Sequence, residues 1–135
     1  MKKKVLIIDK SMSYSLFLEK VLLEEGFAVQ VLHSVRNLTP LERMFNYEAI
    51  FMDINEYIIG GLPFIKGIKI LQPNTRIIFT SENGTHNKDM LKRAMDNGVY
   101  GCIHKPFNRE EITAIVDGLT GSQRRKNPFQ GCFSS

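Results

Sequence analysis

The chain has 135 residues and a formal net charge of +4, and 43% of its residues are apolar. This length suits one domain with one core, and the apolar share is ordinary for a globular protein. No apolar run approaches the roughly 20 residues that a membrane-spanning helix needs. The basic start "MKKK" is followed by only four apolar residues before Asp9, which disfavours a signal peptide. We therefore expect a cytoplasmic protein that does not enter a membrane.

Part of the positive charge lies near the two ends of the sequence, at residues 2–4 and 124–126. Charge at chain ends is usually just solvated, so direct binding of nucleic acid is not expected.

Strand-like runs alternate with helix-like segments along the chain. The first half predicts a strand over 4–9, a helix over 11–26, a strand over 27–33, a short helix over 35–46 and a strand over 48–54. A glycine-bearing loop over 55–61 follows. The second half predicts a helix over 62–72, a strand over 75–81, a helix over 86–98, a strand over 101–106 and a helix over 108–119.

Helix boundaries carry their own signals. Ser11 or Ser13 is placed to cap the first helix, and Gly26 to end it. Asn108 precedes Glu111 by three residues, which predicts a capping box at the start of the last helix. No periodic pattern continues beyond the last helix. Residues 1–120 are therefore predicted to form one domain, and residues 121–135 a flexible tail or linker.

Five strands alternating with helices predict an α/β fold, in which a doubly wound parallel sheet is covered on both faces. Ligands of such sheets bind outside the carboxyl ends of the strands. The polar residues at those ends are Asp9, Asp53, Thr80 and Lys105. We therefore expect them to share one site. No glycine-rich phosphate-binding motif of the dinucleotide or P-loop type is present in the sequence.

The motifs "VLIID", "YEAIFMDI", "IIFTSE" and "GCIHKPF" resemble those of response regulator receiver domains, the phosphoacceptor modules of two-component signalling. Their order and spacing resemble the family pattern over residues 4 to 119. The resemblance implies a flavodoxin-like, five-stranded sheet with strand order 2-1-3-4-5. It also implies that the proline after the lysine, here Pro106, often follows a cis peptide bond.

The resemblance assigns roles to the strand-end residues. Asp53 is implied to accept a phosphoryl group from a sensor histidine kinase or a histidine phosphotransfer protein. Lys105 is implied to pair with the phosphoryl oxygens and Thr80 to hydrogen-bond them. Mg²⁺ is implied to be held by Asp9, Asp53 and the backbone carbonyl of Asn55.

Lys10 departs from the family pattern, because the residue after Asp9 is usually a second acid. The exchange changes the local charge by two units, which is enough to weaken a divalent metal site. Two interpretations stay open. The Lys10 ammonium either pairs with Asp53 or Asp9 and partly replaces the metal, or it points into solvent while the other ligands hold Mg²⁺ weakly.

Three functions are compatible with these residues. The first is a receiver that is phosphorylated on Asp53, changes conformation and signals to an output partner of unknown identity. It modifies only itself, so it is not an enzyme, and the resemblance permits a homodimer. The second is a pseudo-receiver, a binding module in which Lys10 replaces the metal and phosphorylation is weak or absent. The third is a small α/β enzyme with an aspartate nucleophile, for which the loops look too short.

Overall fold

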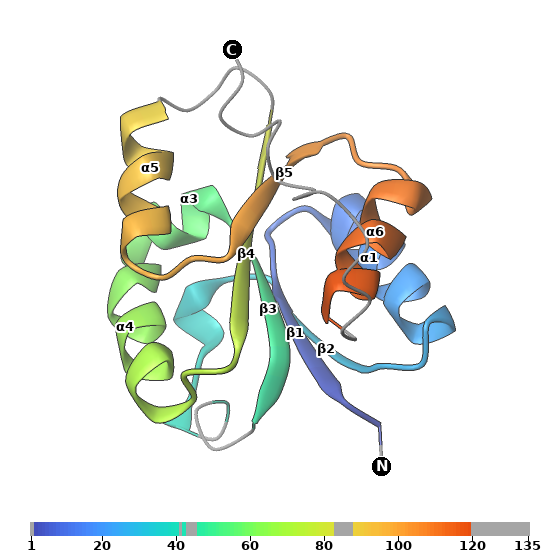
Figure 1. The fold of residues 1–135 in the computed structure, drawn as a ribbon, viewed down its shortest axis with the longest axis horizontal. Coiled ribbons are helices and arrows are strands. Elements are labelled where there is room, and N and C mark those ends of the chain that lie inside the picture. The colour runs from blue at the N-terminus through green and yellow to red at the C-terminus, as the bar shows by residue number, and fades with distance from the viewer. Residues whose placement is uncertain (1, 41, 43–45, 83–87, 120–135) are drawn as a thin grey trace.

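The computed structural model describes residues 2–40, 42, 46–82 and 88–119. A parallel sheet of five strands runs through the centre of the molecule in the order β2-β1-β3-β4-β5 (Figure 1). The strands are β1 (Lys4–Ile8), β2 (Ala28–Leu32), β3 (Tyr47–Asp53), β4 (Arg76–Glu82) and β5 (Gly101–Lys105). This order confirms the predicted flavodoxin-like topology.

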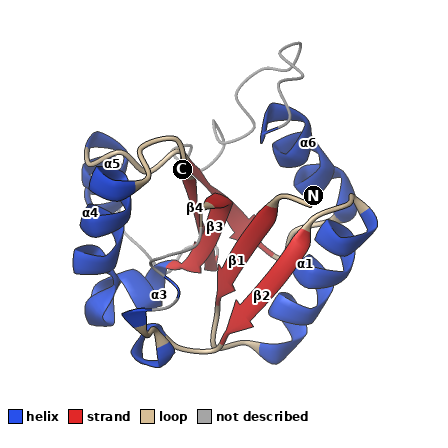
Figure 2. Ribbon diagram, turned by 90° about the horizontal axis from the view of Figure 1, so that it is seen from below, coloured by secondary structure: helices blue, strands red, loops and turns tan. Residues whose placement is uncertain are grey.

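Helices cover both faces of the sheet, as the doubly wound prediction requires. Helices α1 (Met12–Glu24) and α6 (Arg109–Leu119) lie on one face, and α3 (Ile54–Glu56), α4 (Leu62–Leu71) and α5 (Lys88–Asp96) lie on the other (Figures 1 and 2). None of the helices in the described part of the chain has the length and apolar character needed to cross a membrane.

The core consists of two apolar layers, one on each face of the sheet. Leu6 and Ile8 of β1 pack into the layer beneath α4 and α5, whereas Val5 and Ile7 pack into the layer beneath α1 and α6. Successive side chains of a strand point to opposite faces, so a strand covered on both faces must be apolar throughout. This explains the uninterrupted apolar run before Asp9.

The predicted caps are present in the structure. The Ser11 hydroxyl accepts a hydrogen bond from the Tyr14 N–H at 3.4 Å, so Ser11 caps α1. At α6, the Asn108 carboxamide oxygen accepts from the Glu111 N–H at 2.9 Å, and the Glu111 carboxylate accepts from the Asn108 N–H at 3.1 Å. This reciprocal pair confirms the capping box.

The segment predicted as a loop over 55–61 is helical instead. It forms the short helix α3 and then a π-helical turn, η2 (Tyr57–Gly61), which is interrupted where Gly60 adopts φ 154°. The Asp53 carboxylate caps α3 by accepting a hydrogen bond from the Asn55 N–H, which starts a helical turn at the end of the strand. The loop prediction was therefore wrong.

Two other predictions concern residues that are only partly described. The helix predicted over 35–46 begins as a 3₁₀ turn, η1 (Val35–Asn37), and residues 41 and 43–45 of that segment lie outside the described residues. The predicted tail over 121–135 also lies outside them, so the proposed domain boundary stays a prediction.

Alanine substitutions at two glycines, Gly61 at the end of η2 and Gly67 within α4, should have opposite effects on stability. A Cβ atom at Gly61 would lie 2.8 Å from the Met52 sulfur and 3.0 Å from the Glu56 carbonyl oxygen, whereas a Cβ at Gly67 would meet nothing within 4 Å. We expect Gly61→Ala to lower the free energy of unfolding by about 1–3 kcal/mol, because the buried neighbours must move. Gly67→Ala is the matched control. It should raise the free energy by about 0.5–1 kcal/mol, because alanine suits the interior of a helix better. Urea denaturation measures both, and equal effects of the two variants would contradict the packing argument.

Candidate functional site

The predicted site residues meet at the carboxyl edge of the sheet. Asp9 directly follows β1, Asp53 ends β3, and Lys105 ends β5. Thr80 of β4 lies opposite Asp53 in the strand register. The Lys105–Pro106 peptide bond is cis, as the resemblance implies. Parallel strands end at a common edge, so residues separated by almost 100 positions in the sequence become neighbours.

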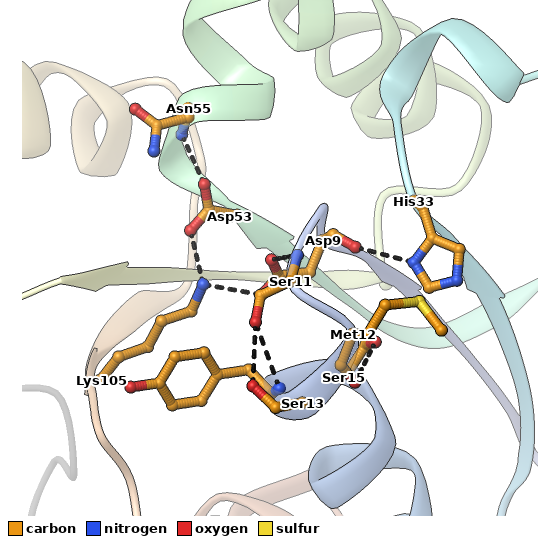
Figure 3. Close-up of polar contacts among 10 residues, drawn as sticks. Asp9, Ser11, Met12, Ser13, Ser15, His33, Asp53, Asn55 and Lys105 are labelled. Atoms are coloured by element: carbon orange, nitrogen blue, oxygen red, sulfur yellow. Dashed lines mark hydrogen bonds and ion pairs between the residues drawn. The ribbon is translucent and has the colours of Figure 1, made fainter.

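The Lys105 ammonium group lies between two carboxylates (Figure 3). Its nitrogen is 2.8 Å from Oδ2 of Asp9 and 2.9 Å from Oδ1 of Asp53. All three residues are almost completely buried, with 5%, 4% and 6% of their surfaces exposed for Lys105, Asp9 and Asp53. The site is therefore a buried ion triad with one positive and two negative charges.

Burial and the two acids act in opposite directions on the lysine. Burial lowers the pKa of Lys105, but the hydrogen bonds to Asp9 and Asp53 and their negative charges outweigh it, so the pKa lies above the ordinary value of 10.5. Because folding raises the pKa of Lys105, the charged form of this lysine favours the folded state, and this contribution is complete below pH 10.5. The stabilisation is lost as the pH rises through the raised pKa.

The other oxygen of each carboxylate is also fixed. Asp9 Oδ1 accepts a hydrogen bond from the Ser11 N–H at 2.9 Å, and Asp53 Oδ2 accepts from the Asn55 N–H at 3.1 Å (Figure 3). Each carboxylate is thus held between the lysine and the turn that follows its own strand. Both acids are oriented before any ligand arrives.

Thr80 contributes a hydroxyl group whose hydrogen-bonding capacity is unused. The residue is 2% exposed, and its Oγ1 has no hydrogen-bond partner among the described residues. A buried hydroxyl left unpaired costs about 1–3 kcal/mol. A polar ligand bound beside Asp53 would offer it a partner.

Lys10 is exposed and forms no ion pair with any described residue, while the ion pairs of Asp9 and Asp53 both go to Lys105. The ammonium that pairs with both acids therefore comes from the end of β5. This arrangement agrees with the interpretation in which Lys10 points into solvent. Its effect on a bound metal stays a prediction.

Asp9 and Asp53 supply two ligand atoms suited to a metal. Carboxylate oxygens are the ligands that Mg²⁺ prefers. Asp9 Oδ2 and Asp53 Oδ1 both pair with the Lys105 ammonium in this structure, so Mg²⁺ bound to these two atoms would require the ammonium to move. Within the described residues, no group of three or more histidine, cysteine or acidic side chains could hold a metal. The acid pair fits Mg²⁺ in chemistry, with fewer charged ligands than the family pattern provides.

Glu56, which lies near the site, serves a different purpose. It is 2% exposed, and its carboxylate accepts a hydrogen bond from the Val35 N–H at 2.6 Å. The contact ties the turn after Asp53 to η1. Because Glu56 is engaged in this way, the structure gives no support for a role as a metal ligand.

Tyr14 is a site residue that the sequence did not reveal. The centre of its ring lies 4.8 Å from the Lys105 nitrogen, and the ring packs against Phe107 with 5.6 Å between ring centres. An aromatic ring attracts an ammonium group placed over its face. The available signal was an aromatic residue in the first turn of a helix that starts at the strand edge.

This contact predicts an energetic coupling between Tyr14 and Lys105. In a double-mutant cycle with Tyr14→Leu and Lys105→Met, the unfolding free energies should show a coupling of about 0.5–2 kcal/mol. Tyr14→Phe is the matched control and should retain most of this coupling, because it keeps the ring. Denaturant titration gives the four free energies. Additive effects of the two substitutions would show that the ring does not stabilise the ammonium.

The sequence of the chain is similar to those of known proteins. A family model described as the response regulator receiver domain matches residues 5–117. The chain is 26% identical over 121 residues to the probable transcriptional regulator ycf29 of Pyropia yezoensis. The alignment covers 88% of this chain and 54% of that relative, so the chain spans about half of the relative's length. It is 29% identical over 118 residues to a protein-glutamate methylesterase/protein-glutamine glutaminase of Rhodospirillum rubrum. That alignment covers 84% of this chain and 30% of the relative.

The fold has relatives among solved structures. A response regulator protein from Burkholderia pseudomallei, solved with a phosphorylated aspartic acid, a calcium ion and citrate, gives a TM-score of 0.70 at 24% identity. The match covers 92% of this chain and 76% of that chain. The strand order, the residues at the carboxyl edge and the family match over most of the sequence agree, and the chain belongs to the response regulator receiver domain family.

Proposed function

We propose that the chain accepts a phosphoryl group on Asp53 from a phosphorylated histidine of a sensor kinase or a phosphotransfer protein. The observation that carries this proposal is the Lys105 ammonium held between the Asp9 and Asp53 carboxylates at the sheet edge. A carboxylate in that setting is a nucleophile with a cation already beside it. Aspartyl phosphorylation is the standard mechanism of the family, which supports the assignment.

In the proposed reaction, an Asp53 oxygen attacks the phosphorus atom of the phosphohistidine. The new P–O bond forms as the P–N bond breaks, and the imidazole leaves with the electron pair of that bond. The product is a mixed anhydride on Asp53. Lys105, whose nitrogen lies 2.9 Å from Asp53 Oδ1 in this structure, would offset negative charge as the phosphoryl group arrives.

Asp9, Asp53 and the backbone carbonyl of Asn55 would hold Mg²⁺. The ion would add the positive charge that two carboxylates and an incoming phosphoryl group require. The Burkholderia pseudomallei relative, with its phosphorylated aspartic acid and calcium ion, supports the combination of acid and cation. The exposed Lys10 adds a further positive charge after Asp9 and lowers the affinity of the acids for a divalent ion.

Signalling would follow from the new hydrogen bond to Thr80. Its buried hydroxyl has no described partner, and a phosphoryl oxygen on Asp53 would supply one. Drawing Thr80 toward Asp53 would shift β4 and the segment after it between two arrangements, which an output partner then reads.

Exposed apolar side chains near the sheet edge favour a protein as the phosphoryl donor. Met12 and Leu16 of α1 are 58% and 56% exposed, and Ile58 of η2, shortly after Asp53, is 53% exposed. These side chains would be covered by a kinase or a phosphotransfer protein docked over Asp53. The cytoplasmic location expected from the sequence and the homodimer that the family resemblance permits belong to this proposal.

The chain would act only on itself, so we do not propose that it is an enzyme. Receiver domains of transcriptional response regulators are generally not enzymes. One relative carries the name of a methylesterase, but this chain spans only 30% of that protein.

A pseudo-receiver is the second candidate function, and Lys10 is the observation that favours it. If the charge of Lys10 prevents metal binding, Asp53 would not be phosphorylated and the domain would only bind partners.

Phosphorylation on Asp53 gives the first test. Incubation of the full chain with acetyl phosphate and Mg²⁺ should add one phosphoryl group, measured by intact-mass spectrometry. Asp53→Ala should abolish the gain, because the nucleophile is removed. Asp96→Ala, which removes an exposed acid on α5, should leave it unchanged. No gain in the wild-type chain would favour the pseudo-receiver.

Lys10 gives the second test. Lys10→Asp restores an acid after Asp9 and should lower the Kd for Mg²⁺ by about tenfold or more, measured by calorimetric titration. Lys20→Asp makes the same charge change at an exposed position farther along α1, and it should change the Kd by less than about twofold. Phosphorylation that appears only in Lys10→Asp would identify the chain as a pseudo-receiver. An unchanged affinity in Lys10→Asp would show that Lys10 does not control the metal.

A further inference from the structure

A concave site lies at the opposite edge of the sheet from Asp53. A hollow of about 780 Å³ is lined by the first residues of four strands, which are Lys4, Ala28, Tyr47 and Arg76. This edge is the lower end of the sheet in Figure 1, near the N-terminus. The seven residues of β3 separate it from Asp53 by about 20 Å.

The residues that line the hollow have a formal net charge of +4, which equals the formal net charge of the whole chain. Five of the 18 lysine and arginine residues line it, and only one of the 14 acidic residues does. The rest of the chain therefore has 13 residues of each sign and is formally neutral. The charged lining residues are Lys2, Lys3, Lys4, Lys69, Arg76 and Glu48.

At least two of these cations have no carboxylate partner among the described residues. Lys3 pairs with Glu48 at 3.4 Å. The Lys69 ammonium instead donates to the carbonyl oxygens of Pro73 and Thr75, each at 3.4 Å. Among the described residues, neither Lys69 nor Arg76 forms an ion pair with a carboxylate. Cations gathered in a concave surface repel one another and attract a polyanion.

An aromatic ring lies beside these cations. The Arg76 guanidinium lies over the ring of Tyr100, 5.4 Å from its centre, and Tyr100 is 37% exposed. A guanidinium placed over an aromatic face can still donate its N–H groups to oxygen acceptors at its edge. The hollow thus combines lysine and arginine N–H donors, which suit phosphate oxygens, with a partly exposed aromatic ring.

We propose that this hollow binds a small organic polyphosphate of the nucleoside phosphate class. Phosphate groups carry the multiple charges and acceptor oxygens that clustered lysine and arginine side chains recognise. The exposed part of Tyr100 offers a surface to a base. The volume lies within the range of about 300–1,000 Å³ that is typical of small-molecule sites, and a concave site of this size does not suit a nucleic acid duplex.

The experiment titrates the full chain with ATP and with inorganic pyrophosphate by calorimetry, in EDTA and at constant ionic strength. EDTA removes divalent ions that would bridge phosphates to Asp9 and Asp53. The hollow variant carries Lys3→Gln, Lys69→Gln and Arg76→Gln. The control variant has the same net charge and alters exposed lysines outside the hollow, through Lys20→Gln, Lys66→Gln and Lys92→Gln.

Both ligands should bind the wild-type chain, with ATP binding more tightly because its base adds a contact. The hollow variant should raise both Kd values at least tenfold, and the control variant by less than about twofold. In NMR spectra, ATP should shift the amide signals of Lys69 and Tyr100 and leave those of Asp53 and Lys105 in place. The hollow variant should still be phosphorylated by acetyl phosphate, which separates this inference from the proposed function.

Several outcomes would overturn the inference. The first is a wild-type Kd above about 1 mM for both ATP and pyrophosphate. The second is an equal loss of affinity in the hollow variant and the control variant. The third is tighter binding of duplex DNA, which ATP does not displace. Circular dichroism checks that the variants are folded. If the hollow variant is not folded, Lys69→Gln alone replaces it, with Lys66→Gln as its control, and an unchanged Kd for ATP would then reject the site.

Discussion

The Lys105 ammonium between the carboxylates of Asp9 and Asp53 is the interaction on which the site depends. Three charges are removed from water there. The free-energy cost of burying them is offset only when each charge has close partners. The partners come from three different strand ends and two following turns. Small changes in strand register would separate them. The chemistry at the edge therefore requires the exact pairing of β1, β3 and β5 within one sheet.

The apolar layers on both faces of the sheet make that precision possible. Closely packed interiors resist small displacements, so the strand ends are held in fixed relative positions. The turns at the edge are held in the same way, by Ser11 at the start of α1 and by Glu56, which joins the turn after Asp53 to η1. Tyr14 adds an aromatic contact to the lysine from the first turn of α1. A phosphoryl group arriving at this edge would meet groups that are already oriented.

The two edges of the sheet have opposite electrostatic character. The carboxyl edge carries the buried acid pair with one lysine, whereas the amino edge carries five cations around a hollow. Asp53 and Tyr47 are the two ends of one strand, so the edges are mechanically connected and electrostatically distant. This separation allows a cationic site to exist in the same small domain without competing for the acids.

The sequence by itself determined the fold and the membership of the carboxyl-edge site. Uninterrupted apolar runs require strands buried on both faces, and such strands alternating with helices require a parallel sheet. That sheet brings Asp9, Asp53, Thr80 and Lys105 to one edge. Only the tertiary structure decided that Lys105 and not Lys10 joins the two acids, and that Tyr14 contacts the ammonium. It also gathered the lysines at residues 2–4, expected to be merely solvated, with Lys69 and Arg76 around one hollow. The physical reason is that contacts between distant residues depend on strand register and side-chain direction, which no local pattern of residues specifies.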